Sequence, residues 1–246
     1  MELTVLGSDG TWPRAGGAAS GYLVRHDGFA LWVDAGTGTL ANLQRSIAID
    51  DIGALALTHA HLDHFLDLYP FFYARWFGSS PDRPRTPVFA PPGLLGRALE
   101  LLPPEAKERV PSVFDIHEVE PGETFHAGPF DVRTALMRHY VPTLGMRIEA
   151  GGASIAYSAD TAPTESLVVL AAGADVLVAE ATLAARDGAD TLHLSAVEAG
   201  EHAAGADAGR LVLSHLRAER DRAAERAAAA FRGDISVAEE GMVVTA

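Results

Sequence analysis

The sequence contains no cysteine among its 246 residues. Disulfide bonds and thiolate metal ligands are therefore excluded, and histidine, aspartate and glutamate are the strong metal ligands that remain. Positive charge is also scarce. The chain has 19 lysine and arginine residues against 33 aspartate and glutamate residues, which gives a formal net charge of -14. A chain with this balance repels phosphate backbones, so nucleic acid is a disfavoured partner.

Long hydrophobic runs are missing too. No stretch approaches the roughly 18 uninterrupted apolar residues of a membrane span, and the first residues, MELTVLGSDG, contain no basic leader. We therefore expect a cytoplasmic protein with no membrane partner. Hydrophobic residues make up 48% of the chain, enough for a well-buried core, and no linker or strong internal repeat interrupts it. We expect one domain over residues 1–246.

The hydrophobic pattern predicts an α/β protein. Strand patterns occupy residues 3–7, 21–36 (a hairpin turning at Asp27-Gly28), 53–59, 112–119, 129–138, 145–149, 153–158, 175–180 and 210–215. Helical patterns occupy residues 93–102, 164–173, 195–206 and the Ala-rich segment 217–233, and residues 62–78 carry large apolar residues at helical spacing until Pro70. Ser195 and Glu198 have the capping-box spacing at the start of the helix at 195–206. This order suits two packed sheets with helices outside.

Residues 58–64, THAHLDH, place three histidines and an aspartate directly after the apolar run ALAL. Imidazole and carboxylate groups are costly to bury without partners. A strand ending near Leu57 and a helix beginning near Leu62 would leave a turn on which these side chains converge, as metal ligands do. The candidate ligands are His59, His61, Asp63 and His64. The alternative is a polar loop in which Asp63 caps the helix.

Further candidate ligands follow other apolar runs. His139 comes after VRTALMR, Asp160 after SIAYSA and His215 after RLVLS, so each lies where a predicted strand ends. Each one alone would be an ordinary loop residue. Together with the first cluster they make five histidines and two aspartates, a set that suits two divalent metal ions such as zinc, with manganese or iron as alternatives.

These motifs resemble the metallo-β-lactamase fold superfamily, whose fold is a four-layered αβ/βα sandwich. The resemblance implies that one metal ion is held by His59, His61 and His139, a second by Asp63, His64 and His215, and that Asp160 bridges them. The segment LWVDAGTGT at residues 31–39 resembles the family's early strand, which ends in a structural aspartate and glycine, here Asp34 and Gly36. Asp34 would orient ligands and would not bind metal.

The C-terminal third resembles the phosphodiesterase branch that includes ribonuclease Z, through YSADT at 157–161, AEATL at 179–183 and HLSAVEAGEHA at 193–203. This resemblance implies that His193 assists the chemistry and that Glu180 holds it; His193 alone would be a capping residue. Bacterial ribonuclease Z carries a tRNA-gripping arm between the third histidine and the bridging aspartate. Here Asp160 follows His139 by only 21 positions, so the arm is absent and tRNA is not an expected substrate.

The resemblance implies a hydrolase that uses a hydroxide shared by two metal ions, with Asp63 moving a proton from the attacking water. The expected substrate is a small phosphodiester or related ester, whose apolar part the aromatic run YPFFYARWF at 69–77 would help to wall. Carboxylic esters, thioesters, lactones and amides are alternative substrates. A non-catalytic metabolite-binding or accessory protein of the same fold would also suit these motifs, and iron-dependent redox chemistry occurs in the superfamily as well. Relatives in this branch are often dimers, so a homodimer stays open.

Overall fold

The computed structural model describes residues 1–78, 80, 83–186, 192–217 and 219–246. Two seven-stranded sheets form its centre, in the orders β14-β1-β2-β3-β4-β5-β6 and β13-β12-β11-β10-β9-β8-β7. The first sheet contains β1 (Glu2–Gly7), β2 (Gly21–His26), β3 (Phe29–Val33), β4 (Ala54–Ala56), β5 (Thr86–Ala90), β6 (Phe114–Glu118) and β14 (Val243–Thr245). The second contains β7 (Thr124–Ala127), β8 (Phe130–Leu136), β9 (Leu144–Ala150), β10 (Ala153–Tyr157), β11 (Val176–Glu180), β12 (Arg210–Ser214) and β13 (Asp234–Val237).

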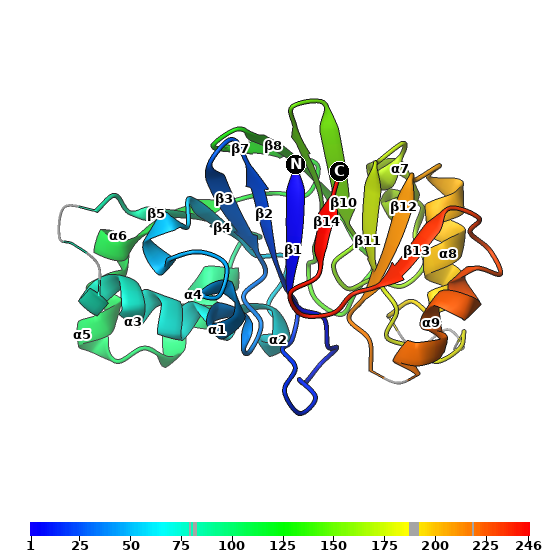
Figure 1. The fold of residues 1–246 in the computed structure, drawn as a ribbon. Coiled ribbons are helices and arrows are strands. Elements are labelled where there is room, and N and C mark those ends of the chain that lie inside the picture. The colour runs from blue at the N-terminus through cyan, green and yellow to red at the C-terminus, as the bar shows by residue number, and fades with distance from the viewer. Residues whose placement is uncertain (79, 81–82, 187–191, 218) are drawn as a thin grey trace.

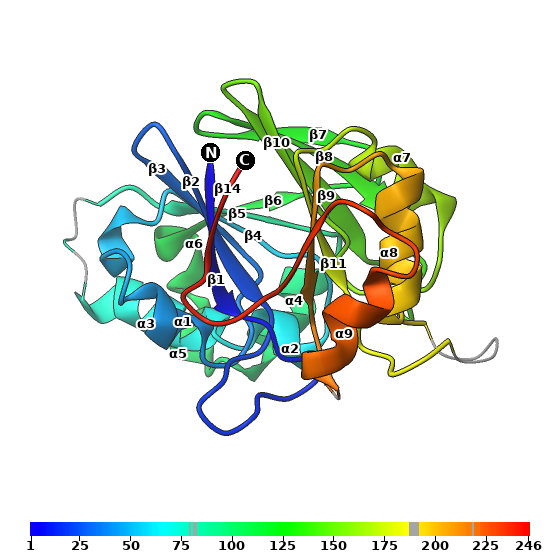
Figure 2. The same cartoon turned by 45° about the vertical axis from the view of Figure 1, so that its right-hand side comes forward.

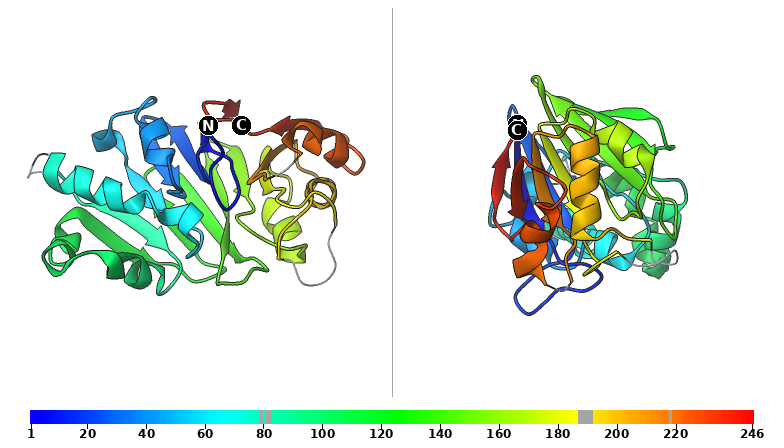
Figure 3. Two further views of the ribbon diagram at one scale, coloured as in Figure 1. Left: turned by 90° about the horizontal axis from the view of Figure 1, so that it is seen from below. Right: turned by 90° about the vertical axis from the view of Figure 1, so that its right-hand side faces the viewer.

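Helices cover the outer faces of both sheets. The first sheet is covered by helices of the N-terminal half, α1 (Thr39–Leu43), α2 (Leu62–Phe65), α3 (Leu68–Gly78), α4 (Leu94–Ala98), α5 (Pro104–Lys107) and α6 (Val110–Val113), with short 3-10 turns at Ile49–Asp51 and Leu99–Leu101. The second is covered by α7 (Glu165–Ala171), α8 (Ala196–Gly205) and α9 (Arg220–Ala227). Figure 1 and the left view of Figure 3 show these layers side by side. The predicted four-layered αβ/βα sandwich is therefore confirmed.

Strand alternation explains how both faces of each sheet become buried. Val5 and Val33 point into the core between the sheets, whereas Leu6 and Trp32, their neighbours in sequence, point toward the outer helices. A third cluster joins the second sheet to α7, α8 and α9. Because both faces are covered, these strands read as nearly continuous apolar runs in the sequence.

Two helix starts follow from local chemistry. Pro70 is the third residue of α3, where its missing N–H has no intrahelical partner to lose, so the helix continues through it to Gly78. The predicted capping box of α8 is confirmed, because the Ser195 side chain accepts from the Glu198 backbone and the Glu198 side chain accepts from the Ser195 backbone.

The predicted helix at 93–102 is split into α4 and a 3-10 turn.

The strand directions bring several strand ends to one edge of the molecule. β3 pairs in parallel with β4, and β10, β11 and β12 are mutually parallel. β8 runs antiparallel to β9, which runs antiparallel to β10, so β8 and β10 end at the same edge. Figure 2 shows the two sheets from a second direction, with α8 and α9 forward. Side chains that follow these strands are thus gathered in one place.

The segment between His139 and Asp160 is short and regular. β9 and β10 pair antiparallel from Ala150↔Ala153 to Met146↔Tyr157. Gly151 and Gly152 join them with φ angles of 59° and 82°, a turn that glycine accommodates without steric cost. No inserted arm is present between His139 and Asp160, all of whose residues the structure describes. In the described part of the chain, no helix has the length and apolar character that crossing a membrane requires.

Candidate metal centre

Asp160 lies at the centre of the predicted ligand set. Its Oδ2 atom is 3.6 Å from Nε2 of His59 and 3.7 Å from Nε2 of His139. Its Oδ1 atom is 3.3 Å from Nε2 of His64 and 3.5 Å from Nε2 of His215. The two carboxylate oxygens therefore face two different pairs of histidines.

His61 and Asp63 complete the two groups. Nδ1 of His61 is 3.1 Å from Nε2 of both His59 and His139. Oδ2 of Asp63 is 3.1 Å from Nε2 of His215 and accepts a hydrogen bond from the Thr11 backbone at 2.8 Å. Helix α2 has His61 as its N-cap residue with no side-chain capping bond, so Asp63 does not cap the helix. The structure thus brings together all seven residues proposed as ligands from the sequence.

The spacing and chemistry of these atoms fit divalent cations. Zinc–nitrogen and zinc–oxygen bonds of about 2.0–2.1 Å place neighbouring tetrahedral ligands about 3.3 Å apart, and the distances between facing atoms here run from 3.1 to 3.7 Å. Nε2 of His64 and Oδ1 of Asp160 are buried without a hydrogen-bond partner. Buried polar atoms are rarely left unpaired, so their joint orientation toward one space indicates a ligand there.

The outer nitrogen of four histidines is held by a neighbouring group. Nδ1 of His139 donates to the carbonyl of Leu192 at 2.9 Å, and Nδ1 of His64 donates to Oδ2 of Asp34 at 2.8 Å. Both acceptors lack a hydrogen, so Nδ1 must carry a proton, and in the neutral imidazole the inward Nε2 then keeps a free lone pair. This is the tautomer that metal coordination through Nε2 requires.

Two threonine hydroxyls hold the remaining pair of outer nitrogens. The Thr58 hydroxyl donates to Asp34 at 2.9 Å and therefore accepts from Nδ1 of His59 at 3.0 Å. The Thr182 hydroxyl donates to Oε2 of Glu180 at 2.6 Å and accepts from Nδ1 of His215 at 2.7 Å. Each hydroxyl has one hydrogen, which is directed to a carboxylate, so Nδ1 of His59 and of His215 carries a proton and the neutral form of each ring presents an unprotonated Nε2 inward.

Asp34 lies behind the ligands, fully buried. Besides His64 and Thr58, it accepts from the hydroxyl of Tyr157 on β10 at 3.0 Å, so it links the two sheets. A Cβ atom on Gly36 would lie 2.1 Å from the carbonyl oxygen of Asp63, which makes glycine necessary for the close approach of these loops. Asp34 therefore holds the candidate ligand His64 directly, and the candidate ligand His59 through Thr58, from outside the ligand cluster.

Three residues of the centre have strained backbones. Asp34, Ala159 and His215 have φ angles of 56°, 50° and 52°, in the left-handed region that non-glycine residues seldom adopt. Asp34 and His215 each directly follow a strand, and Ala159 precedes the candidate ligand Asp160. Such strain persists where surrounding structure enforces it, and it clusters at functional sites.

Charge in the centre favours cations. Burial lowers the pKa of His59 well below its usual value, which keeps the imidazole neutral. Burial also opposes the charged form of His64, but the carboxylates of Asp160 and Asp34 outweigh it and raise the pKa of His64 well above the usual value. The buried carboxylates therefore create a negative potential that a bound cation would neutralise.

His193 lies beside the cluster and is held by Glu180. Nδ1 of His193 donates to Oε1 of Glu180 at 2.9 Å, and the same oxygen accepts from the Thr161 backbone at 2.6 Å. The His193 ring stacks on that of His215, with centroids 5.7 Å apart. Burial lowers the pKa of His193, but the hydrogen bond and charge of Glu180 outweigh it and raise the pKa above its usual value. Ser195 caps α8, so His193 is not the capping residue.

Several residues of the centre have no distinctive signal in the sequence. They are Thr11, Thr58, Tyr157 and Thr182. Thr58 and Thr182 stand inside quoted motifs, THAHLDH and AEATL, but a threonine hydroxyl next to a strand has many ordinary uses. Thr11 and Tyr157 contact residues 52 and 123 positions away, a separation that no local pattern encodes.

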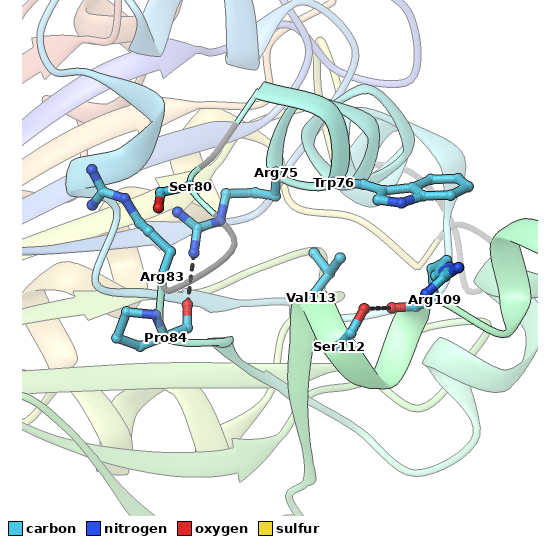
Figure 4. Close-up of a pocket in the computed structure, with 8 residues that line it drawn as sticks. All are labelled: Arg75, Trp76, Ser80, Arg83, Pro84, Arg109, Ser112 and Val113. Carbon is cyan, nitrogen blue, oxygen red and sulfur yellow. Dashed lines mark hydrogen bonds between the residues drawn. The ribbon is translucent and has the colours of Figure 1, made fainter.

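A separate hollow of about 260 Å³ lies between α3 and α6 and contains none of the candidate ligands. Figure 4 shows three arginines around it, whose guanidinium groups point in different directions. Arg75 donates to Asp50 and to the carbonyl of Pro84, and Arg83 also pairs with Asp50. These bonds hold Arg83 and Pro84, which precede β5, beside α3 and Asp50.

Comparison with known proteins gives consistent matches. Residues 30–216 match the family described as "Beta-lactamase superfamily domain". The chain is 29% identical over 255 residues to "Probable metallo-hydrolase YhfI" of Bacillus subtilis (strain 168), covering 99% of both chains. It is 33% identical over 244 residues to "Ribonuclease Z" of Mycolicibacterium gilvum, covering 87% of this chain and 84% of the relative.

Solved structures share the fold. The crystal structure of YhfI, described as a metallo-beta-lactamase fold protein, superposes with a TM-score of 0.89 over 99% of this chain and 98% of that chain, at 29% identity. Human tRNase Z, short form, superposes with a TM-score of 0.77 over 100% of this chain and 99% of that chain, at 23% identity. The protein therefore belongs to the beta-lactamase superfamily domain family, a metallo-hydrolase family with the metallo-β-lactamase fold.

Proposed function

We propose that the protein is a binuclear metal-dependent hydrolase of a small phosphodiester or related ester. The observation that carries this proposal is the arrangement of Asp160, whose two oxygens face separate pairs of histidines. In the proposed site one cation would be held by His59, His61 and His139 and the other by Asp63, His64 and His215, and Asp160 would contribute a ligand oxygen to each. Zinc suits this set, and manganese or iron are alternatives.

Two cations so held would supply a hydroxide nucleophile at neutral pH and stabilise the charge that develops on the bond under attack. The protein's own groups would move the protons. Asp63 is the carboxylate proposed to accept the proton of the attacking water. His193, protonated and held at Nδ1 by Glu180, would donate from Nε2 to the leaving oxygen.

The choice of a phosphodiester is supported by the similarity to a protein named ribonuclease Z, since ribonucleases cleave phosphodiester bonds. RNA itself is not the proposed substrate. The segment from His139 to Asp160 contains only β9, β10 and their connections, with no arm to grip tRNA. The net charge of -14 also opposes binding of a polyanion. A small molecule remains as the proposed substrate.

The proposal is tested by turnover of bis-p-nitrophenyl phosphate beside panels of p-nitrophenyl carboxylic esters and lactones. We expect the metal-loaded protein to prefer the diester and Asp160→Asn to lose that activity. Asp221→Asn, on the exposed face of α9, is the matched control and should retain it. A clear preference for carboxylic esters or lactones would contradict the phosphodiester assignment, and a metal-replete protein inactive on every panel would favour a binding or accessory role.

A further inference from the structure

A small cavity of about 120 Å³ adjoins the candidate metal centre. Its lining includes Ala60, Pro91, Leu94, Arg97, Val141 and Pro142. Ala60 stands between the proposed ligands His59 and His61, and Val141 comes two positions after His139. Part of the cavity lining, Ala60, Val141 and Pro142, therefore stands within three positions of these three histidines in the chain.

The walls of this cavity are apolar and held in place. Leu94 is 3% exposed and its backbone donates to the carbonyl of Pro91 at 3.2 Å. The backbone of Gly93 donates to Glu118 on β6 at 2.9 Å, and the Thr143 hydroxyl donates to the carbonyl of Val141 at 2.9 Å. Proline at three lining positions further restricts the backbone. A preformed apolar wall of this kind binds the apolar part of a ligand.

The cavity volume limits what can enter. An apolar cavity of about 150 Å³ accepts one benzene molecule, so a cavity of about 120 Å³ encloses at most a single ring or a short branched chain. A fused ring system, such as a purine base, exceeds the volume that the cavity can enclose. The walls therefore select a compact group.

Arg97 adds charge at the edge of the cavity. It lies on α4, is exposed, and makes no ion pair or side-chain hydrogen bond with any residue that the structure describes. The chain has a net charge of -14, yet the Arg97 guanidinium has no carboxylate partner among the described residues. Because it lies next to the apolar cavity, it is available to an anionic group of a ligand.

We infer that this cavity is the substrate subsite beside the metal centre and takes a compact apolar group, no larger than one ring, that carries an anionic substituent facing Arg97. This inference rests on the proposed function, because it places the scissile ester at the proposed cations. It narrows the substrate class to small, doubly functional esters whose enclosed part is a single ring or a short branched chain.

Binding of three non-hydrolysable probes by calorimetry to the metal-loaded protein tests the subsite. The probes are phenylphosphonate, 4-carboxyphenylphosphonate and 1-naphthylphosphonate. We expect the carboxyphenyl probe to bind most tightly and the naphthyl probe at least about tenfold more weakly than the phenyl probe, the usual penalty for a misfitting apolar group. Naphthyl binding as tight as phenyl binding would overturn the size limit.

Variants of the lining residues give a second readout. Val141→Phe should weaken phenylphosphonate binding at least about tenfold with metal content unchanged, and Val141→Ala should improve naphthyl binding. Arg97→Gln should reduce the preference for the carboxyphenyl probe about three- to fivefold, the worth of a partly exposed ion pair. Val169→Phe and Arg232→Ala, exposed positions on α7 and after α9, are matched controls and should change nothing.

Failure of the subsite and failure of the proposed function are distinguishable. The subsite alone would be overturned if Val141→Phe and Arg97→Gln left the probe affinities unchanged while the protein still hydrolysed bis-p-nitrophenyl phosphate. Absence of ester hydrolysis, with probe binding altered by the variants as expected, would overturn the proposed function and leave the binding site.

Discussion

The hydroxyl of Thr182 accepts a hydrogen bond from Nδ1 of His215 at 2.7 Å. The same hydroxyl donates to Glu180 at 2.6 Å, and Glu180 in turn holds His193. One threonine therefore fixes the orientation of a proposed ligand and, through Glu180, contacts the group proposed to donate a proton. Hydrogen bonds through Thr182 and Glu180 therefore connect the candidate ligand His215 with the proposed proton donor His193.

Removal of this hydroxyl should weaken metal binding. Thr182→Val keeps the side-chain shape but leaves Nδ1 of His215 without its acceptor. We expect metal affinity to fall about 10- to 100-fold, the usual cost of losing such a supporting contact. Competition with a chromophoric chelator measures this, with Thr124→Val on the exposed face of β7 as control. Equal affinities in Thr182→Val and the wild type would show that this bond does not support the ligand.

Removal of His193 should slow the reaction without loss of metal. If its Nε2 donates a proton to the leaving group, His193→Ala should slow turnover of diesters with poor leaving groups about 10²- to 10⁴-fold. Nitrophenyl diesters should be affected much less, because nitrophenolate leaves without a proton. Paired turnover measurements with elemental analysis check this.

Ser195→Ala is the control for the helix next to His193. It should cost about 0.5–2 kcal/mol of stability through loss of the cap, and it should leave the ratio of the two turnover rates unchanged. A small, equal loss on both substrate types in His193→Ala would contradict the proton-donor role.

Metal removal should lower thermal stability. A cation present at about 100 times its Kd stabilises the folded state by about 2.7 kcal/mol per site. We therefore expect EDTA to lower the Tm of the wild type and to have a smaller effect on the His59→Ala/His61→Ala variant. The exposed pair His117→Ala/His126→Ala is the matched control and should respond to EDTA as the wild type does. An EDTA response of wild-type size in the His59→Ala/His61→Ala variant would remove these residues from the site.

Precursor tRNA should not be processed. The connection from β9 to β10 is a tight glycine turn, and the net charge of -14 opposes polyanion binding. Incubation of the metal-loaded protein with precursor tRNA, with ribonuclease Z as positive control, should yield no specific 3′ cleavage. Specific cleavage at enzyme-like rates would contradict the assignment to small substrates.

Much of the sandwich could be predicted from the sequence because its strands are apolar on both faces and end in polar residues. The runs before His139, Asp160 and His215 form β8, β10 and β12, and the hairpin at 21–36 forms β2 and β3. Its turn has positive φ at Asp27 and Gly28, as the Asp-Gly pair indicates.

Two of the strands that the sequence pattern does not predict, β5 and β14, owe their conformation to neighbouring strands. β14 has three residues and pairs with β1 at the other end of the chain, through Glu2↔Thr245. β5 contains Pro87 in a segment rich in loop-forming residues, yet it pairs with β4 and β6. Hydrogen bonding to a neighbouring strand overrides weak local preference in both.

The candidate ligands could be identified because each is a chemically distinctive residue at a strand end. Their supporting groups could not, because Thr58, Thr182 and Tyr157 act through hydrogen bonds whose partners the fold alone brings near. The strained φ angles at Asp34 and His215 are equally invisible in the sequence, since both residue types also occur in unstrained loops.

Elemental analysis of metal-reconstituted protein tests the binuclear site most directly. Seven ligands exceed what one tetrahedral ion can use, and the two oxygens of Asp160 face different histidines. After removal of excess metal, the wild type should contain two equivalents of zinc or manganese per chain, and Asp160→Asn should contain fewer. One equivalent or none in the reconstituted wild type would contradict a binuclear hydrolase.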